Sequence, residues 1–207
     1  MKYESIIFDI DGTLWDSRET IAEGWNLCLR QEGLDHLCVT PERLTSLFGK
    51  VAEDIADILF ATLPCPGRYD LMRRCEAEAI RYMENDPCRI GYPGIRETIA
   101  ALAKHHRIFI VSNSDTGYPQ LCIRKLDLGA FVSGHLCHGD TGVSKGQTLR
   151  ILMEKHNITD CVYIGDTHGD EMACLEADIP FIYAAYGLGQ AESWDAQIHS
   201  IDELLRM

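Results

Sequence analysis

Two apolar segments that lie far apart in this chain each end in a cluster of aspartates. The first cluster lies in the sequence FDIDGT at residues 8–13, and the second lies in IGDTHGD at residues 164–170. Unpaired carboxylates are costly to bury, so acids that converge at the ends of buried strands need a cation. Carboxylate oxygens are hard ligands that suit Mg²⁺. The sequence therefore predicts a magnesium site where two buried strands end.

Strand-like and helix-like patterns alternate along most of the chain. Four apolar runs are typical of buried parallel strands, at residues 5–9, 108–112, 162–165 and 181–184, and residues 131–137 form a weaker fifth candidate. Apolar residues at helical spacing separate these runs. The alternation predicts an α/β fold, with a doubly wound parallel sheet of the Rossmann-like kind. Such sheets bind ligands beyond the carboxyl ends of their strands, where the aspartates lie.

A long segment after the first acidic cluster breaks this alternation. From about residue 16 to 88 the sequence predicts helices and no strand, and Ser17 and Pro41 are typical helix starts. We expect an α/β catalytic core of residues 1–15 and 89–207. The inserted residues 16–88 would form an all-helical cap domain over the site.

Composition and charge exclude some classes of partner. The net charge of −13 opposes binding to nucleic acid or to anionic membranes, and it requires local cations wherever a phosphate binds. No apolar run approaches the ~20 residues that span a membrane. We expect a cytoplasmic protein, a monomer or small homo-oligomer, without nucleic-acid or membrane partners. The nine cysteines include no CxxC pair, which predicts reduced thiols, with Cys28, Cys122, Cys161 and Cys174 buried.

The pairing of DIDGT with GDTHGD resembles the haloacid dehalogenase-like phosphohydrolases. It is most similar to the branch with a helical cap after the first motif, which includes phosphoglycolate phosphatases and β-phosphoglucomutase. The resemblance covers essentially the whole chain. It implies that Asp9 is the nucleophile, that Asp11 is the general acid and base, and that Lys145 is the catalytic lysine. Lys145 is followed by Gly146 instead of the proline common in this branch.

The resemblance also implies binding roles for further residues. Mg²⁺ would be held by Asp9, Asp11 through its carbonyl, Asp166 and Asp170. Phosphate would be bound by Gly12, Thr13, Ser112, Asn113 and Lys145. Gly49 and Lys50 lie in a short break between two helical patterns, residues 41–48 and 52–63. In relatives this loop reaches the active site, so this pair is the candidate for substrate specificity.

The chemistry of these residue types agrees with such roles. A carboxylate with a pKa near 3.9 is ionised at pH 7, so Asp9 can attack phosphorus without a separate base. Mg²⁺ and Lys145 would offset the repulsion between this carboxylate and the phosphate. Asp11 would protonate the leaving oxygen and then activate water against the aspartyl phosphate. We therefore expect a phosphatase that hydrolyses a small phosphorylated metabolite, a phosphomonoester.

Other interpretations stay open from sequence alone. Relatives that cleave carbon–halogen or phosphonate bonds lack the second aspartate, so Asp11 favours phosphate-ester chemistry. A sugar phosphomutase uses the same residues, and a phosphoacceptor signalling switch places similar groups at strand ends. His135 and His138 suggest a zinc site but lack a further ligand at a familiar spacing. His168 either faces solvent or contacts the substrate.

Overall fold

The computed structural model describes residues 2–87 and 90–207, which form two compact units. The described residues of 1–16 and 90–207 make the first unit, and those of 17–89 make the second. The two units are called here the sheet unit and the helical unit. The predicted boundary between cap and core at residues 88 and 89 lies outside the described residues.

The sheet unit is built on a six-stranded sheet in which all neighbouring strands are parallel. The strand order is β3-β2-β1-β4-β5-β6, so the chain winds outward in one direction from β1 and in the other from β4. This is the doubly wound order of a Rossmann-like fold, and it confirms the predicted fold class. The strands are β1 Ser5–Phe8, β2 Arg107–Ser112, β3 Val132–Cys137, β4 Cys161–Gly165, β5 Phe181–Ala184 and β6 Ala196–Ile198.

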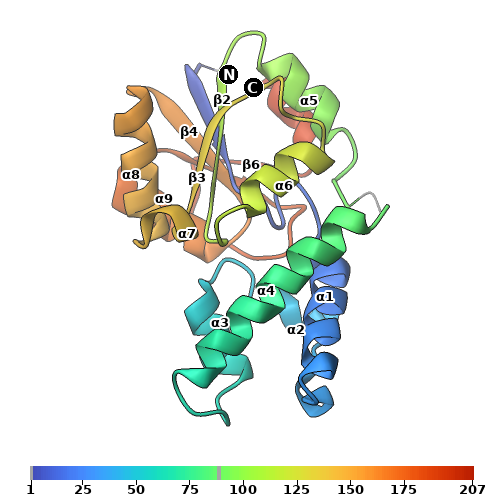
Figure 1. Ribbon diagram of the computed structural model, residues 1–207. Coiled ribbons are helices and arrows are strands. Elements are labelled where there is room, and N and C mark those ends of the chain that lie inside the picture. The colour runs from blue at the N-terminus through green and yellow to red at the C-terminus, as the bar shows by residue number, and fades with distance from the viewer. Residues whose placement is uncertain (1, 88–89) are drawn as a thin grey trace. The chain divides into compact units, whose positions relative to one another are not determined.

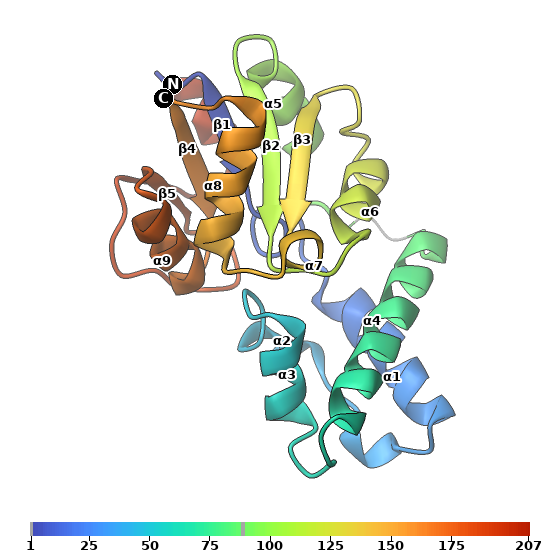
Figure 2. The same ribbon diagram turned by 60° about the vertical axis from the view of Figure 1, so that its left-hand side comes forward.

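Helices cover both faces of this sheet, with α8 and α9 on one face and α5 and α6 on the other (Figures 1 and 2). The buried side chains of α8 and α9 pack on β1, β2 and β4 in one core, which includes Leu149, Cys174 and Phe109. The helices of this unit are α5 Ile95–Leu102, α6 Tyr118–Lys125, α7 His138–Thr141, α8 Lys145–His156, α9 His168–Ala177 and the 3₁₀ helix η2 Ile201–Arg206.

Strand register brings the candidate residues to one edge of the sheet. Phe8, the last residue of β1, is aligned with Ile110 on β2 and Ile164 on β4. Asp9 and Asp166 therefore leave neighbouring strands at nearly the same level, and Ser112 ends the strand on the other side of β1. The crossing point of the doubly wound sheet lies between β1 and β4, where both acidic clusters begin.

The helical unit contains α1 and α4 packed against each other. Gly24 on α1 allows their close approach, since a Cβ at this position would lie 2.4 Å from the Cα of Ala79. Trp25 and Cys28 of α1 are buried, as the sequence pattern predicts. The elements of this unit are α1 Arg18–Gln31, the 3₁₀ helix η1 Asp35–Leu37, α2 Pro41–Thr45, α3 Ala52–Leu59 and α4 Gly67–Asn85.

Several local predictions differ from the structure at element ends. Thr40 caps α2 by accepting from the Arg43 amide, whereas Ser17 precedes α1 without a capping side-chain hydrogen bond. Two helices are shorter than predicted, since α2 ends at Thr45 and α3 at Leu59. Strand β6 was not predicted because a three-residue edge strand leaves almost no periodicity.

Cys28, Cys122, Cys161 and Cys174 are buried, as predicted, and the eight described cysteines are all free thiols. On α9, Ala173, Cys174 and Ala177 are buried, whereas Met172 and Leu175 are 49% and 66% exposed. None of the helices in the described part of the chain combines the length and the apolar character that a membrane span requires.

Candidate active site

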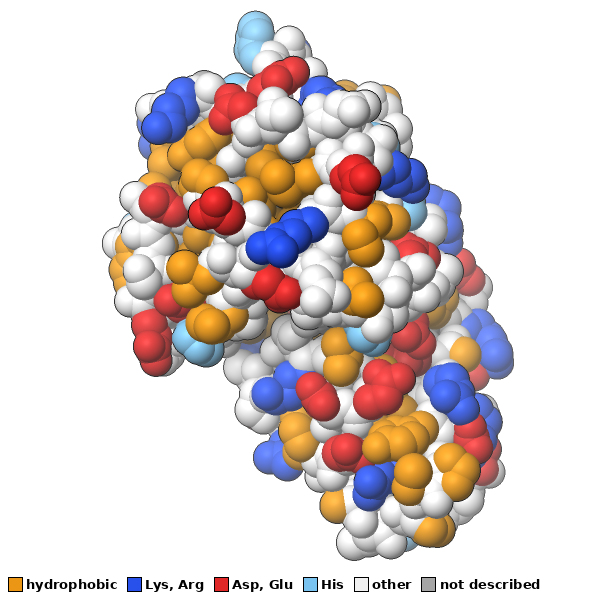
Figure 3. All heavy atoms as spheres, turned by 90° about the vertical axis from the view of Figure 1, so that its left-hand side faces the viewer, with side chains coloured by type: hydrophobic (Ala, Val, Ile, Leu, Met, Phe, Trp, Pro, Cys, Tyr) orange, Lys and Arg blue, Asp and Glu red, His pale blue; other side chains and the backbone are white. Residues whose placement is uncertain are grey.

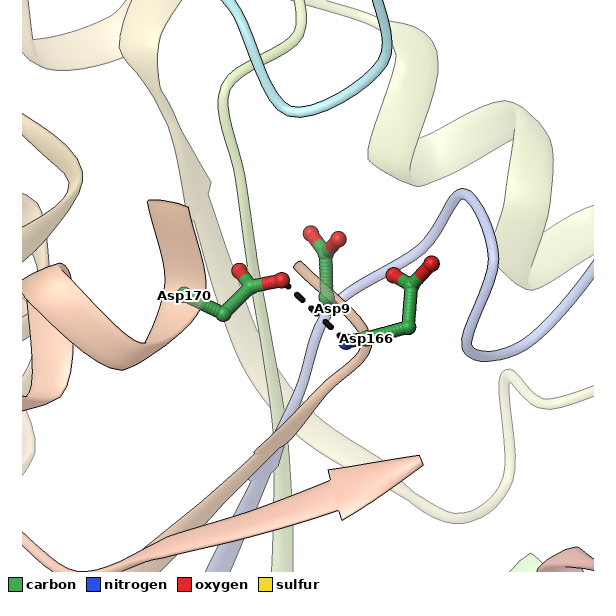
Figure 4. A group of neighbouring side chains, drawn as sticks. All are labelled: Asp9, Asp166 and Asp170. Carbon is green, nitrogen blue, oxygen red and sulfur yellow. Dashed lines mark hydrogen bonds between the residues drawn. The ribbon is translucent and has the colours of Figure 1, made fainter. Parts of the chain in front are cut away.

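Three aspartates from two strand ends and one helix form a buried acidic group. Oxygen atoms of Asp9, Asp166 and Asp170 all lie within 4.8 Å of one another, and Figure 4 shows their carboxylates gathered at the edge of the sheet. Asp9 follows β1, Asp166 follows β4, and Asp170 lies in the first turn of α9. Asp9 is only 3% exposed.

Lys145 joins two of these acids. It is the first residue of α8, and its side chain is buried. Its Nζ donates to Asp9 Oδ1 at 2.9 Å and to Asp170 Oδ1 at 2.7 Å. A lysine at a helix N-terminus is unfavourable toward the helix dipole, so these two ion pairs are what hold the ammonium there.

The pKa shifts reflect one cation among three acids. Burial raises the pKa of Asp9 well above its ordinary value, and Asp170 and Asp166 add to this against the opposing effect of Lys145. Burial and the neighbouring Asp170 raise the pKa of Asp166 to about 7. Burial alone would lower the pKa of Lys145, but Asp170 and Asp9 outweigh it and raise that pKa. The site carries more negative charge than its own lysine neutralises, which favours a bound cation.

Asp170 is surrounded by hydrogen-bond donors. Its Oδ1 accepts from Lys145 Nζ and lies 3.1 Å from the Tyr163 hydroxyl. Its Oδ2 accepts from the amides of Asp166 and Thr167 and from Thr167 Oγ1. Burial would raise the pKa of Asp170, but Lys145 and Thr167 lower it below the ordinary value. With both oxygens engaged, Asp170 anchors Lys145 and the Asp166 loop.

Asp166 is held by the loop that follows β5. Its Oδ2 accepts from the amides of Leu188 at 2.8 Å and Gly189 at 2.9 Å. Gly12 packs against the same carboxylate, because a Cβ there would lie 2.1 Å from Asp166 Oδ2, and its φ of +83° favours glycine. The orientation of Asp166 is therefore set by backbone groups on two sides.

The carboxylate of Asp11 lies outside this acidic group. Its Oδ1 accepts from Trp15 Nε1 at 2.8 Å and from the Tyr118 hydroxyl at 2.7 Å. The resemblance assigns the metal to the carbonyl of Asp11, not to its side chain, so the different environment agrees with a separate role for this acid. Asp9 and Asp11 thus both follow β1, but their carboxylates lie in different surroundings.

Comparison with known proteins decides the family. The family model of the haloacid dehalogenase-like hydrolases matches residues 6–184, most of the chain. The chain belongs to this family.

Individual relatives agree with this assignment. A phosphoglycolate phosphatase from Photobacterium profundum is 28% identical over 193 residues, covering 88% of this chain and 83% of the relative. One from Xanthomonas campestris is 27% identical over 209 residues, covering 94% and 90%. A haloacid dehalogenase-like family hydrolase from Streptococcus pneumoniae has the same fold, with a TM-score of 0.80 at 20% identity, covering 99% of this chain and 97% of that one. The predictions of the family and of an enzyme of the hydrolase class are confirmed.

The predicted phosphate-binding residues of this hydrolase lie around the acidic group. Ser112 is buried at the end of β2, and its Oγ accepts from the amide of Ser114 at 3.3 Å. Asn113 follows it directly. Thr13 is buried, and its Oγ1 lies 3.5 Å from Asp166 Oδ1. Their role toward phosphate stays a prediction.

The structure explains the departure from the family's Lys-Pro pattern. A Cβ at Gly146 would lie 2.4 Å from Glu176 Oε2. Glu176 reaches across this position from α9 and accepts a hydrogen bond from Ser144, the N-cap of α8. A larger residue at 146 would displace Glu176 from this position. Glycine next to Lys145 is therefore compatible with the hydrogen bond that joins α9 to the start of α8.

The remaining candidates are distributed elsewhere. Gly49 and Lys50 belong to the helical unit, where Gly49 has a φ of +84° in the turn between α2 and α3. His168 is half exposed and lies 3.0 Å from Glu171 through Nδ1. Across residues 2–87 and 90–207, the three aspartates are the only group of three or more side chains suited to a metal. Within those residues, His135 and His138 belong to no such group.

Some residues of this site could be predicted from sequence patterns and others could not. Thr167 and Asp170 form a reciprocal capping box on α9, and their spacing is a known helix-start signature. Trp15, Tyr118 and Tyr163 were not identified. Aromatic residues in apolar segments are typical of core packing, and nothing in the sequence shows that their polar atoms meet catalytic acids.

Proposed function

We propose that this hydrolase releases phosphate from a small phosphomonoester through an aspartyl phosphate formed on Asp9. The observation that carries this proposal is the contact between Lys145 and Asp9 in a buried acidic group at the crossing point of the sheet. A purely structural site would not need three acids against one lysine, because buried unbalanced charge destabilises a fold.

The residues have distinct parts in this reaction. Asp9 supplies the attacking oxygen, and Lys145, which holds its Oδ1, lies where it would also meet a phosphate oxygen. Asp170 fixes Lys145, and the loop at Leu188 and Gly189 fixes Asp166. Asp11 passes a proton to the leaving oxygen and receives one from water.

The acidic group fits Mg²⁺. Its donors are carboxylate oxygens, which this ion prefers, and burial together with the neighbouring acids raises the pKa values of Asp9 and Asp166, which supports binding of a further positive charge. Asp9 and Asp166, with the carbonyl of Asp11, would hold it, with Asp170 behind them. When bound, the ion would neutralise charge on the phosphate and orient it toward Asp9.

For the substrate we propose a phosphate ester of a small hydroxy acid, with phosphoglycolate as the first compound to test. Two relatives that match nearly the full chain carry the name phosphoglycolate phosphatase. In this proposal residues 16–88 act as the cap, and Lys50 meets the carboxylate of the substrate. A cytoplasmic location and an oligomeric state no larger than a small homo-oligomer stay predictions.

The test is a hydrolysis screen over small phosphate esters with Mg²⁺, with Asp9→Asn as the blank. We expect continuous release of inorganic phosphate by the wild type, with none above background in the blank. Conversion of a sugar phosphate to its isomer without phosphate release would indicate a mutase instead. A long-lived phosphoprotein after incubation with acetyl phosphate would indicate a phosphoacceptor switch.

A further inference from the structure

The loop that follows β5, residues 185–189 and called here the β5 loop, lies against both acidic motifs. A Cβ at Gly187 would lie 2.3 Å from the Cβ of Asp166 and 2.5 Å from the carbonyl oxygen of Gly12. A larger residue at this position would have to displace backbone of the first motif, so glycine permits the close approach. The β5 loop is therefore packed between the first acidic motif and the second.

Two tyrosine hydroxyls bond to the backbone at this loop. The Tyr186 hydroxyl donates to the carbonyl of Thr13 at 2.8 Å. Tyr183 lies in β5, and its hydroxyl donates to the carbonyl of Gly189 at 3.2 Å. The ring of Tyr186 packs edge to face on that of Tyr92, with centroids 5.1 Å apart and planes at 75°, a favourable geometry for aromatic pairs. Burial raises the pKa of Tyr186, so its hydroxyl stays a donor.

The β5 loop also supplies the backbone amides that hold Asp166. The amides of Leu188 and Gly189 donate to its Oδ2 at 2.8 Å and 2.9 Å. Groups that hydrogen-bond to a metal-binding carboxylate set its orientation, and removing such groups weakens metal binding. A backbone amide has no rotamers of its own, so the position of these two donors depends on what holds the loop.

We propose that Tyr186 and Tyr183 are positioning residues for the metal site. Their hydroxyls hold the β5 loop in place, and the amides of that loop orient Asp166 toward the first acidic motif. Tyr186 has the larger part, because its bond to Thr13 joins the loop directly to the first motif. Both residues act through the backbone and the carboxylate. This inference rests on the proposed Mg²⁺-dependent function.

The two alkaline-earth ions distinguish positioning from a general contribution to stability. Mg²⁺ requires a nearly ideal octahedral arrangement of ligands, whereas Ca²⁺ accepts a looser and more variable one. A small displacement of Asp166 should therefore weaken the binding of Mg²⁺ more than that of Ca²⁺. Hydroxyls that served stability alone would leave the relative affinities for the two ions unchanged.

The experiment measures the binding of Mg²⁺ and of Ca²⁺ to the metal-free protein at pH 8 by isothermal titration calorimetry. Tyr186→Phe removes one hydroxyl and keeps the ring that packs on Tyr92. We expect its Kd for Mg²⁺ to rise about tenfold, the lower end of the usual effect of removing a group behind a metal ligand. Its Kd for Ca²⁺ should rise less than about threefold. Tyr183→Phe should show the same selectivity with a rise of about threefold for Mg²⁺, because its hydrogen bond is longer.

Controls separate positioning from unfolding. Tyr3→Phe removes a hydroxyl before β1, at the opposite end of that strand from Asp9, and should leave both Kd values unchanged. Circular dichroism at the temperature of the titration shows whether each variant is folded. If Tyr186→Phe does not fold, Tyr183→Phe decides the question.

The outcomes for the inference and for the proposed function differ. Unchanged Mg²⁺ binding in the folded tyrosine variants, or a loss of Ca²⁺ binding as large as that of Mg²⁺, would overturn the inference and leave the proposed function intact. Absence of Mg²⁺ binding by the wild type would remove the metal from the proposed function, and this inference with it.

Discussion

Charged side chains are arranged differently in the sheet unit and in the helical unit. In the sheet unit, Asp9, Asp166 and Asp170 form a buried acidic group, and Lys145 pairs with two of them, Asp9 and Asp170. In the helical unit, arginines meet acids one to one on or near the surface, as in Arg74–Glu32 and Arg30–Glu23. Figure 3 shows the same interspersed pattern of acidic and basic side chains across one face of the molecule.

This difference shows which charges serve stability and which serve chemistry. Exposed ion pairs typically contribute only ~0–1 kcal/mol and are tolerant of change. Buried acids in excess of their cations oppose folding, so their presence points to a ligand that supplies the missing positive charge. Substitutions in the two units, and removal of the metal, would test this difference.

Asp9→Asn should have the largest effect on activity and little effect on folding. We expect phosphate release to fall by at least about 10⁴, as for other enzymes that lose their nucleophile. The metal-free variant should be as stable as the wild type or more stable, because a neutral amide removes one of the crowded charges. Phosphate assays and urea unfolding would measure both. Retention of most activity at equal purity would contradict the assignment of Asp9 as the nucleophile.

Lys145→Met should have the largest effect on stability. It leaves the three acids without their cation, and breaking a buried ion pair in this way typically costs about 3–5 kcal/mol. Urea unfolding of the metal-free protein at pH 7 would measure the change. If the loss is below about 1 kcal/mol, the pair behaves like a surface pair and the contrast between the units fails.

Metal removal should change stability in a way that depends on pH. The pKa of Asp166 is raised from 3.8 to about 7, so the folded state binds more protons than the unfolded state between these values. Stability of the metal-free protein should therefore fall as the pH rises from about 4 to 7. Asp9, whose pKa is also raised, acts in the same direction.

Mg²⁺ binds the deprotonated acids, so its stabilising effect should be larger at pH 8 than at pH 5.5. At about a hundred times its Kd, it should raise Tm by roughly 5–10 °C at pH 8. Thermal unfolding in EDTA and in Mg²⁺ would show this. Asp166→Asn should weaken the Mg²⁺ effect at pH 8, and an equal effect of Mg²⁺ on that variant would place the metal elsewhere.

Lys50→Ala tests whether a charged side chain of the helical unit takes part in substrate recognition. We expect kcat/KM for the preferred substrate to fall by ~1–3 kcal/mol, comparable to a lost charge-assisted hydrogen bond. A generic aryl phosphate, which needs only the acidic group, should be hardly affected. Lys104→Ala in the sheet unit is a matched control that should change neither rate. Equal losses for both substrates would mean that Lys50 is not a specificity residue.

Arg74→Ala should have the smallest effect. Its pair with Glu32 joins two side chains that are 49% and 40% exposed, so we expect a loss of stability of at most about 1 kcal/mol. Activity should stay unchanged. A loss as large as that of Lys145→Met would show that the helical unit also depends on its ion pairs.

Much of the site was predictable because its residues have chemical signatures. Asp9, Asp166 and Asp170 stand out as acids at the ends of apolar runs, and parallel strands bring such ends together. Lys145 was placed by family resemblance and is found between Asp9 and Asp170. The alternation of strands and helices predicted the sheet, apart from the short edge strand β6.

Other features depend on contacts between distant residues. Three such features are properties of packing: the burial of Asp9, the hydrogen-bond donors around Asp170, and the hydrogen bonds that Trp15 and Tyr118 donate to Asp11. Tyr118 is more than a hundred residues from Asp11 in the chain. Nothing local to either residue encodes that their side chains meet.

The alternating fold and the acids at the strand ends could be inferred from residue type and periodicity, which are local properties of the chain. The family was indicated by the resemblance of its two acidic motifs. Only the folded structure shows that Lys145 pairs with Asp9 and Asp170, and that Trp15 and Tyr118 donate hydrogen bonds to Asp11. Burial, pKa and hydrogen-bond partners depend on groups brought together only when the chain folds, because desolvation and Coulomb interactions act over distances in space.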